Sequence, residues 1–190
     1  DLKLDQSTAD KHMVVNSNYF NLTVDGKFDA NNLDKAFNQV LNSYYPTFIP
    51  KIKTKTVYTD AFKFELTVKK FKIVSPNTII NGDFDASKNI LNINLKADSI
   101  SYGKVKFNNN VIESYSKNNK VNLVYKASNI KLTDSLELKN YFMYMVSKDL
   151  ETKYNLEWDN KTSPKNAGKL AGKVNFGGQV ATLTFDKFFI

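Results

Sequence analysis

A stretch of alternating apolar and polar residues at positions 22–30 recurs in altered form at 80–86 and 170–176. Alternation with a period of two is typical of a β-strand that has one buried and one solvent-exposed face. Each copy carries a glycine on its apolar side, and these are Gly26, Gly82 and Gly172. Repetition of this kind predicts a structure that extends by adding similar units.

The period of the apolar positions changes over residues 32–44, where they recur three and four residues apart. This spacing predicts one amphipathic helix of about three turns. Asn31 or Asn32 can cap its first turn, and Pro46 ends it because a proline disfavours helical backbone in the preceding residue. The apolar positions of this helix are Leu33, Ala36, Phe37, Val40, Leu41 and Tyr44.

A second repeat relates residues 91–102 to residues 121–132. In both copies the apolar positions change from odd to even numbers after an alanine, Ala97 in the first and Ala127 in the second. A strand keeps its buried face unless an extra residue intervenes. The pattern therefore predicts a β-bulge near 98–99 and another near 128–129.

Taken together, the segments predict roughly twelve short strands and one helix, with short polar connections that favour antiparallel pairing. The fold class is mainly β: a curved, mostly antiparallel sheet that forms an open, taco-like apolar groove, with one short amphipathic helix. The alternative is a closed β-sandwich, whose strands carry the same alternation. We interpret residues 1–190 as a single β-rich section of a larger repetitive protein.

The apolar parity of the strands defines one inward face, which would line either the groove or the sandwich core. Glycine at inward positions favours the groove, because a closed core is usually filled by side chains. The candidate lipid-contacting residues are Val24, Phe28, Phe62, Phe64, Leu66, Leu91, Ile93, Leu95, Val121, Leu123, Tyr125, Leu156 and Trp158.

Residues that could carry catalysis are scarce. The chain has one histidine, His12, and no cysteine, which removes thiolate metal sites, cysteine nucleophiles and disulfides. Asp83 and Asp85 fall on the same side of a strand, where a solvated face explains them better than a metal site. We therefore expect no enzyme activity, no catalytic residues, no metal and no cofactor.

The formal net charge of +8 is spread along the chain. Lysines alternate with apolar residues, as at 62–64 and 105–107, so they lie on the solvent faces of strands. This distribution favours weak attraction to an anionic membrane surface over nucleic acid, which is not an expected partner. The longest apolar run, 141–146, is far shorter than the ~20 residues that a membrane-spanning helix needs.

Several segments resemble a known family. The strand at 26–29, the helix with Leu33 and Ala36, and residues 44–46 followed by Pro50 resemble TamB-like proteins of the AsmA superfamily, particularly those of Bacteroidota. Residues 154–162 and the alternating segment 168–176 are similar to them too. The resemblance covers most of the chain and rests on order and spacing.

The resemblance implies an internal or C-terminal section of a protein that is anchored in the inner membrane of a Gram-negative bacterium and crosses the periplasm. Such proteins form a long β-structure with an apolar groove, and they are implicated in phospholipid transport to the outer membrane and in protein assembly there. The implied partners are phospholipid acyl chains and, through other parts of the full protein, a TamA-like outer-membrane barrel. The family offers no catalytic residues.

A different class of function follows from the closed-sandwich alternative. In that case the chain would be a domain of a surface lipoprotein or adhesin that binds protein or glycan through its loops. Uptake of a long-chain lipid separates the two interpretations, because only an open face has room for it.

Overall fold

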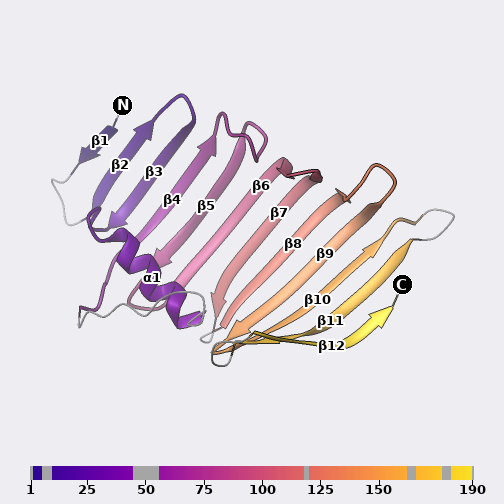
Figure 1. Ribbon diagram of the computed structural model, residues 1–190. Coiled ribbons are helices and arrows are strands. Elements are labelled where there is room, and N and C mark those ends of the chain that lie inside the picture. Colours follow the sequence, from indigo (N-terminus) through magenta and orange to yellow (C-terminus); the bar gives the residue numbers. More distant parts are fainter. Residues whose placement is uncertain are drawn as a thin grey trace.

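The computed structural model of the chain describes residues 2–5, 10–44, 56–117, 120–161, 166–176 and 181–189. Within these residues the strands form one sheet, and the strand order in the sheet follows the chain (Figure 1). The strands are β1 (Leu2–Asp5), β2 (Lys11–Asn16), β3 (Phe20–Lys27), β4 (Ala61–Val68), β5 (Thr78–Asp85), β6 (Ile90–Tyr102), β7 (Val105–Lys117), β8 (Lys120–Lys131), β9 (Glu137–Lys148), β10 (Glu151–Asp159), β11 (Ala167–Asn175) and β12 (Thr182–Phe189).

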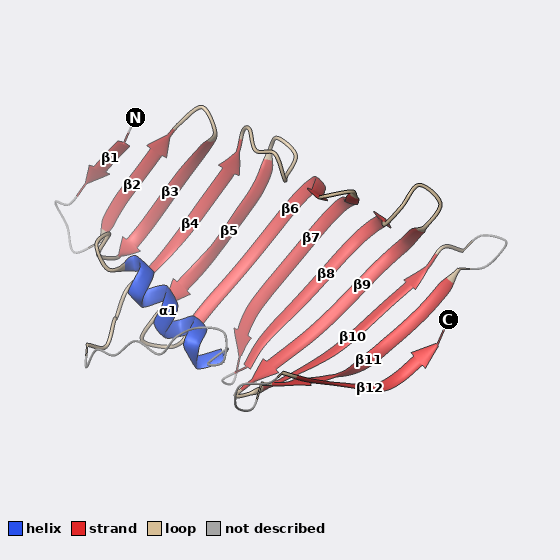
Figure 2. Ribbon diagram, viewed as in Figure 1, coloured by secondary structure: helices blue, strands red, loops and turns tan. Residues whose placement is uncertain are grey.

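Every neighbouring pair of strands is antiparallel, so the sheet is a meander of 12 strands. The prediction of a mainly β, antiparallel fold with one short helix is confirmed for the described residues (Figure 2). The strands are longer than expected, since β6 and β7 each run for 13 residues. The closed sandwich does not describe this arrangement, because the described strands belong to a single open sheet.

The helix predicted over residues 32–44 is present as α1 (Leu33–Tyr44). It connects β3 to β4 and packs with the side chains of Ala36, Val40 and Tyr44 against the sheet. Its partners there include Phe62 and Phe84, so the helix covers one face of the sheet near β4 and β5. Pro46 and Pro50, which were expected to end and follow the helix, lie outside the described residues.

Hydrogen bonds fix the helix to the strand ends. The side-chain amide of Gln39 donates to the carbonyl oxygens of Tyr58 and Ala86, both at 3.1 Å, and accepts from the Tyr58 backbone N–H at 2.9 Å. Tyr44 Oη donates to the carbonyl oxygen of Asn89. These contacts attach the second half of the helix to the chain just before β4 and to the turn after β5.

The bulges predicted near 98–99 and 128–129 are wrong. The register between β6, β7, β8 and β9 is the same before and after residues 98–99 and 128–129. Instead, Asn109 and Asn140 adopt left-handed backbone there, with φ of 52° and 49°. These residues lie in alternate strands, β7 and β9, and the four strands keep their register without an inserted residue. Ile130, beyond this point in β8, is buried.

Candidate functional site: one apolar face of the sheet

A row of apolar residues crosses the sheet, one residue from each strand from β2 to β12. Each member is the cross-strand partner of the next, so all of them lie on the same face. We call this the apolar row, and it consists of Val15, Leu22, Leu66, Ile80, Leu95, Ile112, Tyr125, Met143, Leu156, Leu170 and Phe188.

A parallel row two residues along the strands lies on the same face. Its members are Met13, Val24, Phe64, Gly82, Ile93, Ser114, Leu123, Met145, Tyr154, Gly172 and Phe185. Because side chains two residues apart point the same way, Phe62, Leu91, Val121 and Trp158 share this face with the two rows. We call the whole surface the apolar face.

The candidate lipid-contacting residues lie together on this face. All of them except Phe28 lie within a strand. Phe28 follows β3 rather than lying within it, and its ring packs edge-on against Phe62 with centroids 5.9 Å apart. The sequence pattern did not predict that β9 contributes residues to the apolar face. Met143 and Met145 complete the rows there, but every residue from Tyr141 to Val146 is apolar, so alternation gives no signal for which side faces inward.

Burial divides the apolar face into two parts. Beneath α1 the side chains are buried, with Val24 at 4%, Phe62 at 7% and Phe84 at 2% exposure. Further along the sheet, Leu95 and Leu123 are only half-buried. The helix covers the part of the face in its buried cluster, whereas Ala97, Asn110 and Ala127 are buried on the same face outside that cluster.

Each inward glycine lies directly opposite an aromatic residue of the neighbouring strand. The pairs are Gly26 with Phe62, Gly82 with Phe64, Gly168 with Trp158, and Gly172 with Tyr154. A Cβ added at Gly168 would meet the Trp158 ring at 2.1 Å, and one at Gly172 would meet Tyr154 Oη at 2.6 Å. The space above these two glycines is therefore filled by rings that lie across them, as occurs in aromatic rescue of strand glycines.

At Gly26, Gly82 and Gly172 the backbone also approaches closely, and a Cβ added at Gly172 would lie 2.0 Å from the carbonyl oxygen of Thr184. An added Cβ would lie 2.4 Å from the carbonyl oxygen of Ala61 at Gly26, and 2.0 Å from that of Asn92 at Gly82. Gly26 has φ of 140°, which side-chain-bearing residues rarely adopt. The glycines thus accommodate close strand approach and neighbouring rings.

Polar groups on the apolar face are paired with one another. Asn110, 1% exposed, accepts a hydrogen bond from Tyr125 Oη at 2.8 Å and donates to the carbonyl oxygen of Phe107 at 3.0 Å. The hydroxyls of Ser147 and Thr152 lie 2.8 Å apart. Burial, with a smaller effect of the neighbouring Tyr141, raises the pKa of Tyr125 to about 12, so this tyrosine stays neutral at physiological pH.

The opposite face carries charged and amide side chains together with apolar ones such as Val111, Val124 and Phe142. Its cross-strand neighbours include Lys63 with Asp83 and Glu157 with Lys169, whose Nζ lies 2.6 Å from the Glu157 carboxylate. Hydrogen bonds from Lys169 and Asn155 lower the pKa of Glu157. Both partners of this pair are partly exposed, so the pair contributes little stability.

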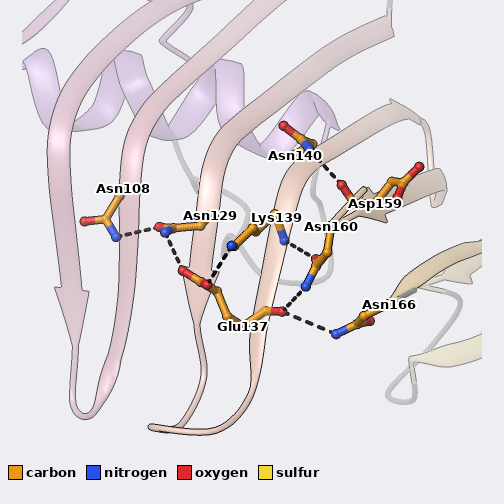
Figure 3. A network of polar contacts seen from close by, with 8 residues as sticks. All are labelled: Asn108, Asn129, Glu137, Lys139, Asn140, Asp159, Asn160 and Asn166. Atoms are coloured by element: carbon orange, nitrogen blue, oxygen red, sulfur yellow. Dashed lines mark hydrogen bonds and ion pairs between the residues drawn. The ribbon is translucent and has the colours of Figure 1, made fainter. Parts of the chain in front are cut away.

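A polar network joins the strand ends from β7 to the segment before β11 (Figure 3). The Glu137 carboxylate accepts from Asn129, and the Glu137 carbonyl oxygen accepts from Asn160 at 3.1 Å and Asn166 at 3.4 Å. The full set is Asn108, Asn129, Glu137, Lys139, Asn140, Asp159, Asn160 and Asn166. Sequence reasoning missed it, because amide side chains near turns are ordinary and reveal no pairing.

No group of three or more metal-binding side chains occurs among the described residues. His12 Nδ1 lies 2.5 Å from the Asp25 carboxylate, and both side chains are more than half exposed. This pair lies on the opposite face, because His12 and Asp25 are register partners offset by one from the parallel row. No helix in the described part of the chain is long and apolar enough to cross a membrane.

No family model, curated protein or solved structure matches this chain. The resemblance to TamB-like proteins, which rests on residue order and spacing, therefore stays a prediction.

Proposed function

We propose that this chain is a non-enzymatic lipid-binding section that holds phospholipid acyl chains on its apolar face. In this proposal the face forms the floor of an apolar groove, and the chain belongs to a TamB-like bridge across the periplasm. Other parts of the full protein would provide the inner-membrane anchor and the contact with a TamA-like barrel. The bridge would serve phospholipid transport to the outer membrane or protein assembly there.

The observation that carries the proposal is the apolar row. It continues without a polar interruption from β2 to β12, whereas a domain ordinarily covers such a face with a second layer. In the described residues, the buried cluster that contains α1 includes residues from β2 to β8, and the rest of the face lies outside that cluster. An acyl chain is apolar, so its chemistry suits the part of the apolar face that α1 does not cover.

The dimensions of the row suit more than one acyl chain. Strands in a sheet are about 4.8 Å apart, so a row from β2 to β12 spans on the order of 50 Å. One acyl chain covers half of a bilayer core of about 30 Å, or roughly 15 Å. The whole row has the length of about three chains placed end to end, and its part packed with α1 is not free to hold one.

Retention would be passive. Burial of apolar surface contributes about 25 cal/mol per Å², which retains a chain without a specific polar anchor. Because similar side chains follow one another along the row, a bound chain would move between positions of nearly equal free energy. The row itself supplies no direction of transfer.

Binding of a fluorescent long-chain fatty acid to the delipidated protein tests the proposal. We expect saturable binding that is lost in a Leu95→Asp, Leu123→Asp variant, because two carboxylates would lie on the apolar face. The matched control is Lys96→Ala, Lys126→Ala. It changes the net charge by the same amount on the same two strands, at exposed positions of the opposite face.

The control variant should bind as the parent protein does, and circular dichroism should show equal strand content in all three proteins. Absence of saturable binding, or equal loss in both variants, contradicts the proposal. The adhesin function presupposed a closed sandwich, and no observation on the described sheet favours it as a second candidate.

A further inference from the structure

Three connections at the strand ends opposite α1 lie together (Figure 1). The backbone N–H groups of Lys69 and Lys70 donate to the carbonyl oxygen of Tyr19, at 2.8 and 3.1 Å. The N–H of Ser101 donates to the carbonyl oxygen of Ile73 at 2.7 Å. The β4–β5 connection is thus hydrogen-bonded to the β2–β3 turn on one side and to the end of β6 on the other.

These connections expose large apolar side chains. Tyr19 is 61% exposed, Phe71 62%, Ile73 46% and Tyr102 77%. Tyr19, Phe71 and Ile73 line an open hollow together with Lys70 and Lys72. Such side chains at a tip, away from the packed sheet, do not contribute to the hydrophobic core.

The charge around them has one sign. Segments 17–19, 69–77 and 102–106 contain no aspartate or glutamate. They contain five lysines, of which Lys69, Lys70, Lys72 and Lys104 stand beside the exposed aromatics and are themselves exposed. We call these four lysines, with Tyr19, Phe71, Ile73 and Tyr102, the basic-aromatic cluster.

We propose that the basic-aromatic cluster docks on the surface of an anionic lipid bilayer. Lysines near a negatively charged surface each contribute favourable electrostatic free energy, and aromatic rings are preferred at the boundary between headgroups and acyl chains. The combination of apolar and basic groups supplies the two contributions that lasting membrane association needs. This role goes beyond the proposed lipid-holding face, which lies on other residues.

A nucleic acid or a protein partner fits the cluster less well. Single-stranded nucleic acid is bound by aromatic rings along a basic groove, whereas these rings project from turns at the strand ends. An acidic protein surface would complement the lysines but would leave Phe71 and Ile73 against charged groups. A bilayer satisfies both kinds of side chain at once.

Co-sedimentation of the whole chain with vesicles tests this proposal. We expect binding to vesicles of phosphatidylcholine mixed with phosphatidylglycerol, little binding to phosphatidylcholine alone, and release in about 1 M salt, where charge is screened beyond about 3 Å. Lys70→Gln, Lys72→Gln, Lys104→Gln should weaken binding on the order of a hundredfold, at about fivefold for each lysine. Phe71→Ser should also weaken it.

The matched control, Lys27→Gln, Lys96→Gln, Lys126→Gln, removes the same charge from exposed positions outside the cluster and should bind as the parent does. Equal loss in both triple variants overturns the proposal, as does displacement by an oligonucleotide that shows the cluster to prefer nucleic acid. The Leu95→Asp, Leu123→Asp variant should still sediment with vesicles. Loss of vesicle binding in that variant would assign the association to the apolar face and overturn the role of the cluster.

Discussion

At the scale of single residues, the inward glycines act together with the aromatic residues opposite them. The Trp158 ring occupies the space in which a Gly168 side chain would stand. Trp158 is held there by a hydrogen bond of 2.9 Å from its Nε1 to Asn166 Oδ1. The glycines therefore leave no empty positions in the apolar face into which a ligand could fit.

Gly168→Ala should destabilise the protein by about 1–3 kcal/mol, because the added Cβ displaces the indole ring. Urea unfolding measures the change, and the fluorescence of Trp158, the single tryptophan, reports displacement of its ring. Gly103→Asn is a control, since a Cβ there meets nothing within 4 Å and asparagine tolerates its φ of 59°. Equal stability of Gly168→Ala and the parent would contradict this packing.

Tyr125→Phe should cost about 1–3 kcal/mol at neutral pH, because it leaves the buried Asn110 Oδ1 without its hydrogen-bond donor. It should also change the dependence of stability on alkaline pH. A folded-state pKa of about 12, above the ~10 of an unfolded tyrosine, contributes stability below pH ~10 that is lost as pH rises toward 12.

Unfolding midpoints measured from neutral pH to about pH 12 check this, and the loss attributable to Tyr125 should be absent from Tyr125→Phe. The exposed Tyr19→Phe should leave the free energy of unfolding at neutral pH unchanged. A Tyr125→Phe profile parallel to that of the parent would contradict the assignment.

At the scale of elements, local pattern was sufficient for α1 and insufficient for the strand distortions. The three-and-four spacing of Ala36, Val40 and Tyr44 is a property of the helix alone, so it could be predicted. The change of parity after Ala97 was also visible. The unusual backbone at this point belongs to Asn109 in the next strand, and one strand's pattern does not contain its neighbour's backbone conformation.

The attachment of α1 by Gln39 is a tertiary feature that the helical pattern does not reveal. Gln39→Ala should lower the free energy of unfolding by about 1–3 kcal/mol, because the buried Tyr58 N–H loses its acceptor. Urea denaturation measures this, with the exposed Asn38→Ala as the control on the same helix. Indistinguishable values for the two variants would show that Gln39 does not hold the helix in place.

At the scale of the whole molecule, the alternation predicted which residues share a face but not which strands are neighbours. A strand's apolar parity is local, and it placed Leu66, Leu95 and Leu156 correctly on one side. Alternation is identical in an open sheet and a sandwich, so the single meander had to come from the structure. The fully apolar β9 and the amide network around Glu137 had no comparable local signal.

The central claim is that acyl chains lie along the apolar row. Photo-crosslinking with a fatty acid that carries a diazirine near its methyl end, followed by peptide mass spectrometry, tests it most directly. We predict adducts on apolar-row residues such as Leu95, Tyr125 and Met143, and none on the neighbouring Lys96, Lys126 and Phe142 of the opposite face. Adducts distributed equally over both faces, or confined to the basic-aromatic cluster, would contradict the claim.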